Sequence, residues 1–270
     1  MITIVQFLLI LAAFIGCKKS GSTDIAPPQD DSIPALPGWT LVWNDEFSGT
    51  AVDLSKWEYE VNGDGGGNNE LQYYTARVQN SYIDSGSLVV EARKENYLAR
   101  EYTSARMRTK YKGDWTYGRF DIRAKLPYGQ GMWPAIWMLP SDGAYGGWPR
   151  SGEIDIMELV GHQANKVYGT IHFASESGAH QQSGGSFTLP NGAFDGAYHL
   201  FSIVWDTTGF RWSLDGLNYF STTHKQPFDK RFHMLLNVAV GGNWPGDPDA
   251  FTTFPQRMYV DYVRVYTKSN

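Results

Sequence analysis

The chain of 270 residues contains a single cysteine, Cys17, so it has no second thiol with which to build a disulfide framework. Positive charge is also scarce: the formal net charge is -5, so the summed field would repel a phosphate backbone and we expect no nucleic-acid partner. The sequence has no internal repeat, no glycine-rich nucleotide loop and no Cys/His metal cluster. What remains is a single ordinary domain, which this length allows.

Long hydrophobic runs are absent except at the N-terminus, where residues 2–15 read ITIVQFLLILAAFI. This run has the length of a signal peptide's apolar region and is short of the roughly 20 residues that a membrane-spanning helix needs. It is followed by Gly16-Cys17, and this ending resembles a bacterial lipobox, in which a small residue precedes the cysteine that is acylated. We therefore interpret 1–16 as a lipoprotein signal peptide and Cys17 as the lipidation site, with an ordinary cleaved signal or a wrongly placed start as alternatives.

Residues 17–37 are rich in serine, aspartate and proline and have no hydrophobic period, which is typical of a flexible linker. The expected organisation is a tether over 17–37 that holds one catalytic domain, 38–270, off a membrane. The protein is then expected to be secreted and lipid-anchored to a bacterial cell envelope, at the outer membrane, its periplasmic face or the cell surface. We expect a monomer.

The domain itself follows a period of two. In segment 119–126, RFDIRAKL, apolar and charged residues alternate, which is typical of a strand with one buried face. Segments 88–93, 201–205 and 259–266 are strand-like as well, and Asp215-Gly216 is a hairpin signal. Since no segment has a convincing helical period, the sequence predicts an all-β fold, a jelly-roll sandwich of two antiparallel sheets.

Aromatic residues make up 15% of the chain, including 10 Trp and 16 Tyr. Most of them suit a β-rich core, because aromatic rings pack well on pleated, half-buried surfaces. A sugar-binding cleft would account for some of the tryptophans, because the apolar face of a pyranose ring lies flat on an indole.

The most informative segment is 151–160, SGEIDIMELV, which places three acids among aliphatic residues. In a regular strand Glu153 and Asp155 share one face, whereas Glu158 points to the other. One β-bulge at Ile156-Met157 restores the parity, because an extra residue moves every later side chain to the opposite face. We therefore predict a bulged strand whose three acids line one wall of a cleft.

Three carboxylates side by side are costly, since each disfavours the ionisation of the next. Glycoside hydrolysis uses such repulsion: one carboxyl group must stay protonated to give a proton to the leaving oxygen, while another must stay ionised to attack the sugar or activate water. A solvated acidic edge strand or a calcium site is the alternative. The regular interleaving with Ile and Met favours catalysis.

Segment 153–158 resembles the active-site strand of glycoside hydrolase family 16 in its bulged form, as found in laminarinases, which are endo-1,3-β-glucanases. The similarity covers residues 39–266. It is also carried by the motifs WNDEF at 43–47, NNELQYYT at 68–75, GMWPAIWM at 131–138 and GGNWPG at 241–246. Together the motifs are far more specific than any one of them.

The resemblance implies an open concave cleft and a retaining double displacement. In that scheme Glu153 is the nucleophile, Glu158 the acid/base, and Asp155 the residue that steadies the nucleophile and its proton network. The residues themselves support a catalytic pair without assigning the two roles. No cofactor is expected for catalysis.

Eight further residues match positions that face the cleft in the family and are expected to bind substrate. Burial in the core is the alternative for each tryptophan among them, and an ordinary structural role is the alternative for the histidine. The eight are Asn68, Arg106, Trp133, Trp137, Trp148, His172, Asn237 and Trp244.

The resemblance also implies a structural calcium ion on the convex side, away from the chemistry. The matching positions are Glu46, Gly86 and Asp261, which offer the mixture of carboxylate and backbone oxygen that calcium prefers.

The expected activity is cleavage of internal β-1,3 linkages, or of mixed β-1,3-1,4 linkages, in a neutral glucan such as laminarin. Relatives with the same strand cut agarose, porphyran or carrageenan, so a marine galactan is the alternative substrate; a sulfated one would favour several Arg or Lys in the cleft. A β-glucan-binding protein that no longer cleaves is a further alternative. The three acids in register argue against it.

Overall fold

The computed structural model describes residues 33–224 and 226–269. The predictions about the signal peptide 1–16 and about Cys17 lie outside these residues, as does most of the tether. Within the described part there are 18 strands and one short 3-10 helix, Gly161–Gln163. None of its helices is long and apolar enough to cross a membrane. The predicted all-β class is confirmed.

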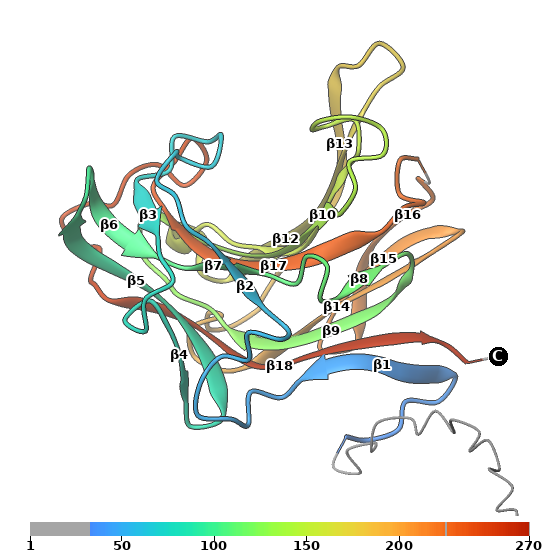
Figure 1. Cartoon of the computed structure of the whole chain (residues 1–270), viewed down its shortest axis with the longest axis horizontal. Coiled ribbons are helices and arrows are strands. Elements are labelled where there is room, and N and C mark those ends of the chain that lie inside the picture. Colours follow the sequence, from blue (N-terminus) through green and yellow to red (C-terminus); the bar gives the residue numbers. More distant parts are fainter. Residues whose placement is uncertain (1–32, 225, 270) are drawn as a thin grey trace, which may run out of the picture. The chain divides into compact units, whose positions relative to one another are not determined.

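Ten strands form the first sheet, which is the lower layer in Figure 1. They are β1 (Trp39–Asp45), β3 (Gln72–Tyr74), β4 (Ser81–Asp84), β5 (Ser87–Tyr97), β6 (Arg100–Ser104), β9 (Gly118–Lys125), β14 (His199–Asp206), β15 (Gly209–Leu214), β16 (Leu217–Thr222) and β18 (Gln256–Lys268). Their order is β16-β15-β14-β9-β18-β5-β6-β3, with β1 on β18 and β4 on β5.

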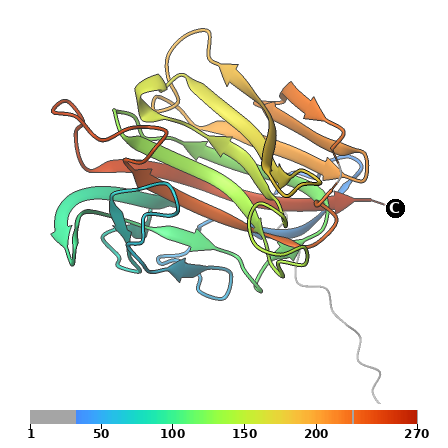
Figure 2. The same cartoon turned by 90° about the horizontal axis from the view of Figure 1, so that it is seen from above.

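Eight strands form the second sheet, which lies over the first and rises toward β13 at one edge (Figure 1). They are β2 (Glu58–Glu60), β7 (Arg106–Arg108), β8 (Asp114–Trp115), β10 (Met132–Pro140), β11 (Glu153–Glu158), β12 (Lys166–Ala174), β13 (His180–Thr188) and β17 (Phe232–Val240). The order is β13-β12-β11-β10-β17-β7-β2, with β8 on β17. Seen from above, these strands run side by side across the molecule (Figure 2).

The hydrophobic core contains side chains from both sheets. Ile154, Ile156 and Met157 of β11 belong to the same buried cluster as Ile203 and Trp212 of the ten-stranded sheet. Full burial of an aliphatic side chain of this size contributes about 1.5–3 kcal/mol. β11 is therefore anchored through its core face, and its acidic face lines the cleft.

The predicted strands at 88–93, 201–205 and 259–266 lie within β5, β14 and β18, which are each longer, and the strand predicted at 119–126 is β9, displaced by one residue. The hairpin signal is also confirmed: Asp215-Gly216 joins β15 to β16, with φ of 49° and 81°, the positive values that a tight hairpin turn requires. One pair departs from the antiparallel expectation. β3 and β6 are parallel, because β4 and β5 supply the crossover between them.

Candidate active site

The acidic strand β11 lies inside the eight-stranded sheet, between β10 and β12. On both sides the pairing skips one residue between Asp155 and Glu158. Ile136 of β10 and Gly169 of β12 each face the two residues Ile156-Met157 in place of one. The predicted bulge is thus confirmed at the predicted position, and it puts the three acids on one face while both bulge residues are buried.

A buried indole from the opposite sheet supports the bulge. Trp212 of β15 donates from Nε1 to the backbone oxygen of Asp155 at 2.8 Å. A bulge disrupts the ladder, and a buried carbonyl without a partner would cost about 1–3 kcal/mol. Gly169 leaves room for the ring, since a Cβ at that position would lie 2.4 Å from Trp212 Cδ1.

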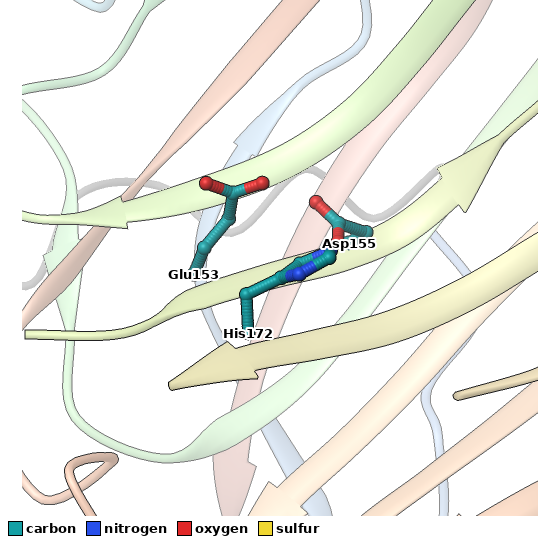
Figure 3. Close-up of side chains that lie close together, drawn as sticks. All are labelled: Glu153, Asp155 and His172. Carbon is teal, nitrogen blue, oxygen red and sulfur yellow. Dashed lines mark ion pairs between the residues drawn. The ribbon is translucent and has the colours of Figure 1, made fainter. Parts of the chain in front are cut away.

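The acids lie close together at the floor of the cleft. One carboxylate oxygen each from Glu153 and Asp155 and one ring nitrogen of His172 lie within 4.8 Å of one another (Figure 3). Burial, and next the charge of Asp155, raise the pKa of Glu153 to about 8. Burial, and next the charge of Glu153, raise the pKa of Glu158 to about 7. The pKa of Asp155 is raised as well, by burial and by the charge of Glu158.

These shifts mean that the cluster holds protons at neutral pH instead of three charges, and the groups titrate together. The mutual effect has a useful direction. As long as Glu153 is an anion, its charge raises the pKa of Glu158 and so helps that carboxyl group to keep its proton. Hydrolysis of a glycosidic bond requires one ionised and one protonated member. In the free enzyme burial raises the pKa of Glu153, to about 8, further than that of Glu158, to about 7, so the nucleophile must give up its proton before it can attack.

Each glutamate has its own indole partner. Trp133 donates from Nε1 to Glu158 Oε1 at 3.0 Å, and this bond lowers the pKa of Glu158 against the larger effect of burial. Trp148 acts in the same direction on the pKa of Glu153. The two carboxylates are thus stabilised separately.

His172 of β12 pairs directly with Glu153 in the sheet and points toward Asp155 (Figure 3). Its Nε2 lies 3.1 Å from Asp155 Oδ2. The angle is too poor for a hydrogen bond, so among the described residues this buried oxygen has no hydrogen-bond partner. The histidine therefore faces the acids and does not serve only the core.

All residues predicted for catalysis or substrate binding line one cleft, whose volume is about 1230 Å³. The structure brings together Asn68, Arg106, Trp133, Trp137, Trp148, Glu153, Asp155, Glu158, His172, Asn237 and Trp244. All seven strands of the path that runs from β2 at one edge of the eight-stranded sheet to β13 at the other contribute to the lining. The cleft therefore crosses the sheet along its whole width.

The tryptophans differ in what they offer to a ligand. Trp148 and Trp244 are 57% and 41% exposed, and they lie on the two sides of the acids. Trp244 packs edge-on against Trp133 at 5.5 Å between ring centroids. Trp137 is half-buried and donates from Nε1 to Asn237 Oδ1 at 2.7 Å, so its indole nitrogen already has a partner within the protein.

Arg106 is held from all sides. Its guanidinium lies over the rings of Tyr74 and Trp137, at 4.6 and 5.3 Å from their centroids, and 3.5 and 3.7 Å from carboxylate oxygens of Glu60 and Glu70. Burial alone would lower the pKa of Arg106, but Tyr74, Glu70 and Glu60 together outweigh it and raise this pKa above its usual value. The arginine is a fixed cation of the cleft wall.

The second arginine of the cleft, Arg108, is paired with Glu58 and Glu60 on β2. Both guanidinium groups that line the cleft are therefore neutralised by carboxylates of the protein.

Some lining residues were not predicted from the sequence. Tyr168 could have been found, because it lies four residues before His172 and thus on the same face of β12. Glu70 lies within the motif 68–75 but reads there as one polar residue among several. His180 had no signal, since β13 reads HQQSGGSFT and shows no apolar alternation.

Two of the positions suggested for calcium, Glu46 and Asp261, have arginine partners in this arrangement. Arg264 contacts both carboxylate oxygens of Glu46, at 3.0 and 2.8 Å, and Asp261 Oδ2 lies 2.6 Å from Arg123 Nη1. A cation would have to compete with these guanidinium groups. Within residues 33–224 and 226–269, the only cluster of three side chains with metal-ligating atoms at short range is Glu153, Asp155 and His172.

Comparison with known proteins decides the family. The family described as Glycosyl hydrolases family 16 matches residues 68–264. The chain belongs to glycoside hydrolase family 16. The match includes the bulged strand and the cleft residues from Asn68 to Trp244, so the resemblance seen in the motifs holds for most of the domain.

Several of the similar proteins have names that refer to the cleavage of glucans. The chain is 45% identical to a beta-glucanase of Rhodothermus marinus, over 95% of this chain and 92% of that protein. It is 42% identical to glucan endo-1,3-beta-glucosidase A1 of Niallia circulans, over 94% of this chain and 42% of that longer protein. The structure of the laminarinase from Rhodothermus marinus superimposes with a TM-score of 0.80 at 45% identity, over 87% of this chain and 100% of that one.

Proposed function

We propose that this family 16 enzyme is a retaining endo-1,3-β-glucanase that hydrolyses a neutral glucan such as laminarin. The observation that carries the proposal is the bulge in β11, which brings Glu153, Asp155 and Glu158 onto the floor of a cleft flanked by exposed indoles. The names of the similar proteins, beta-glucanase, endo-1,3-beta-glucosidase and laminarinase, support the same substrate class.

In the proposed first step the Glu153 carboxylate attacks the anomeric carbon, while Glu158 gives its proton to the departing glycosidic oxygen. The bond from the anomeric carbon to that oxygen breaks as the bond to Glu153 forms. In the second step Glu158 takes a proton from a water molecule, whose oxygen displaces Glu153 from the sugar. The β configuration is restored by the second inversion.

Asp155 and His172 assist these two reaction steps through their effect on Glu153. Asp155 and Glu153 are close enough to share a hydrogen bond, which raises the pKa of Glu153 and lowers that of Asp155. When a sugar occupies the nucleophile, the proton can remain on Asp155. His172, opposite Glu153 in the sheet, then adds a lowering effect on the pKa of both glutamates when it is charged.

The course of the cleft supports cleavage inside a chain. Its lining runs from Tyr59 on β2 to Gln182 on β13, across seven strands. With neighbouring strands about 4.8 Å apart, six spacings amount to about 29 Å. A groove of that length can hold several sugar units on both sides of the acids.

The charges of the cleft support a neutral substrate over a sulfated galactan. Recognition of sulfate would call for a free guanidinium or ammonium group. Arg106 and Arg108 are both engaged by glutamates of the protein, as described above. Rearranging the pairs of Arg106 would leave the buried Glu70 and the half-buried Glu60 without this partner, which is costly.

The decisive experiment compares reducing-sugar release from laminarin, lichenan, agarose and carrageenan by the wild type, Glu153→Gln and Glu158→Gln. Glu176→Gln, in the exposed turn after β12, is a matched control. We expect release from laminarin, and a loss of about a thousandfold in each catalytic variant because each substitution removes an ionisable group at nearly constant volume. The control should keep wild-type rates.

Proton NMR of the same digestion tests the stereochemistry. The β-anomer should appear first, with the α-anomer arising only by mutarotation. Early α-anomer would exclude the retaining mechanism, and activity confined to agarose or carrageenan would exclude the neutral glucan.

For the N-terminus we propose a lipoprotein signal peptide over 1–16, acylation of Cys17 and anchoring of the monomeric enzyme to a bacterial cell envelope. The apolar run and the position of the single cysteine support this. Cys17→Ser should prevent labelling by a fatty-acid analogue and change the partition of the protein between membrane and soluble fractions. Equal partition and equal labelling of wild type and variant would contradict the anchor.

A further inference from the structure

The acidic cluster continues into a row of two histidines that reaches the edge of the sheet. His172 Nδ1 lies 2.8 Å from Nε2 of His180 on β13, a hydrogen-bond distance, and His172 Nε2 lies 3.1 Å from Asp155 Oδ2. The row Asp155, His172, His180 therefore crosses three neighbouring strands. His180 also lines the cleft.

The number of N–H groups in this row decides which ring nitrogen donates and which accepts each hydrogen bond. A neutral imidazole carries one N–H, so it can donate from only one of its nitrogens. If His172 presents its N–H to the buried Asp155 oxygen, its Nδ1 must accept a hydrogen bond from His180. If the proton of His172 lies on Nδ1 instead and Asp155 is ionised, two acceptor atoms face each other between His172 and Asp155.

The second arrangement is unfavourable at this site. Asp155 Oδ2 is buried, has no hydrogen bond within the described part of the chain, and faces His172. An additional lone pair directed at this oxygen would leave a buried acceptor unsatisfied and repelled. The first arrangement needs only a small rotation of the imidazole to complete the bond.

We propose that His180 is a positioning residue of the hydrolytic reaction: its Nε2–H donates to His172 Nδ1 and thereby holds His172 in the tautomer whose proton faces Asp155. This role depends on the proposed glucanase function only for its effect on turnover. Asp155 then has two neighbours with different roles: Glu153 on one side and the neutral hydrogen-bond donor His172 on the other.

The surroundings of His180 are consistent with a neutral donor. Burial lowers the pKa of His180, and a charge on His172 would lower it further. The other ionisable groups placed around the pair are Glu153 and Asp155 on β11 and, in the loop before β11, Arg150, whose guanidinium lies beside Gly178 in the turn between β12 and β13. Glu176 belongs to the same exposed turn.

The exposed Trp148 connects this row to substrate binding. Its ring lies 4.8 Å from that of His180 and 6.4 Å from that of His172, between centroids. A sugar stacked on Trp148 would cover the histidine pair and exclude water from it. The hydrogen bond is exposed in the free enzyme, so we expect its effect to appear in kcat more than in KM.

Two substitutions of His180 separate the donor from the ring. His180→Phe keeps a ring against Trp148 but removes the donor, whereas His180→Gln keeps an N–H donor and loses the ring. We expect His180→Phe to lower kcat on laminarin about five- to tenfold with KM changed less than about twofold, the loss of one hydrogen bond. His180→Gln should stay within about twofold of the wild type.

The tautomer is measured directly by ¹⁵N NMR of the imidazole nitrogens, with the His172 signals assigned by their loss in His172→Gln. The wild type should show the proton on Nε2 of His172, and His180→Phe should show a mixture of tautomers. His199→Phe, which removes a histidine paired with Asp215 on the other sheet, is the control and should change neither tautomer nor kcat.

A wild-type His172 with its proton on Nδ1 overturns the proposal, even if His180→Phe fails to fold. Wild-type kcat in a folded His180→Phe, or a loss in His180→Gln equal to that in His180→Phe, also overturns it. Because the NMR experiment uses the free protein, it remains valid if laminarin is not the substrate.

Discussion

The hydrogen bond from Trp133 to Glu158 allows a quantitative prediction for Trp133→Phe. The substitution removes the indole N–H that lies 3.0 Å from Glu158 Oε1 and keeps an aromatic ring. Because this bond favours the anion, its removal should raise the pKa of Glu158. Hydrogen bonds to charged groups contribute about 1.5–3 kcal/mol, and 1.36 kcal/mol corresponds to one pKa unit. Glu158 is open to the cleft, so we expect the lower part of this range, about one unit.

The shift is visible in the pH dependence of kcat/KM on laminarin. If Glu158 is the acid, the enzyme loses activity as pH rises through the pKa of Glu158. The alkaline limb of the Trp133→Phe profile should therefore lie about one pH unit higher than in the wild type, while the acid limb, set by ionisation of Glu153, stays near its place.

Trp137→Phe is the matched control, because the indole of Trp137 donates to Asn237 and not to a carboxylate. It should leave both limbs in place, whatever it does to KM. An alkaline limb of Trp133→Phe that is unmoved or moved to lower pH would refute the reasoning. So would an equal shift in the control.

Three further predictions follow from burial and packing. Folding raises the pKa of Glu153 from 4.5 to about 8, so the folded protein binds this proton more tightly than the unfolded chain and loses stability as pH rises between these values. In calorimetry, Glu153→Gln should therefore have a higher Tm than the wild type at pH 8 but not at pH 4. Equal differences in Tm at both pH values would contradict this. Gly169→Ala places a Cβ against Trp212 and should lower the free energy of unfolding by about 1–3 kcal/mol in urea titrations. Gly192→Ala is the control without a clash, because a Cβ at this loop glycine would have nothing within 4 Å and its positive φ of 74° adds only backbone strain. Since Glu46 and Asp261 already have arginine partners, EDTA should leave Tm and activity unchanged, and a fall in Tm restored by added calcium would show that the ion displaces those pairs.

Local patterns in the sequence were sufficient for the strands and for the bulge. The alternation in 119–126 and the hairpin signal at Asp215-Gly216 depend on neighbours in the chain. The bulge followed from the alternation of side chains alone. In a regular strand the three acids cannot all lie on the cleft face while the aliphatic side chains between them lie in the core. In each case the information lies within about ten residues.

Contacts between distant segments could not be predicted in this way. Trp212 is 57 residues from Asp155, and nothing in its own segment indicates a bond to that carbonyl. The same holds for His180, and for Arg264, which occupies the carboxylate of Glu46 from 218 residues away. The resemblance supplied positions for a calcium ion but not the partners that those side chains have here.

The ladder around the bulge suggests that the active strand could lose a residue and keep its chemistry. The neighbours Ile136 and Gly169 continue in regular register, so the surplus lies in β11 alone. Deleting Met157 would leave a strand in which ordinary alternation brings Glu153, Asp155 and Glu158 to the same face. The separation of the two glutamates in space is therefore fixed by β10 and β12, and the number of residues between them along the chain is free to vary by one.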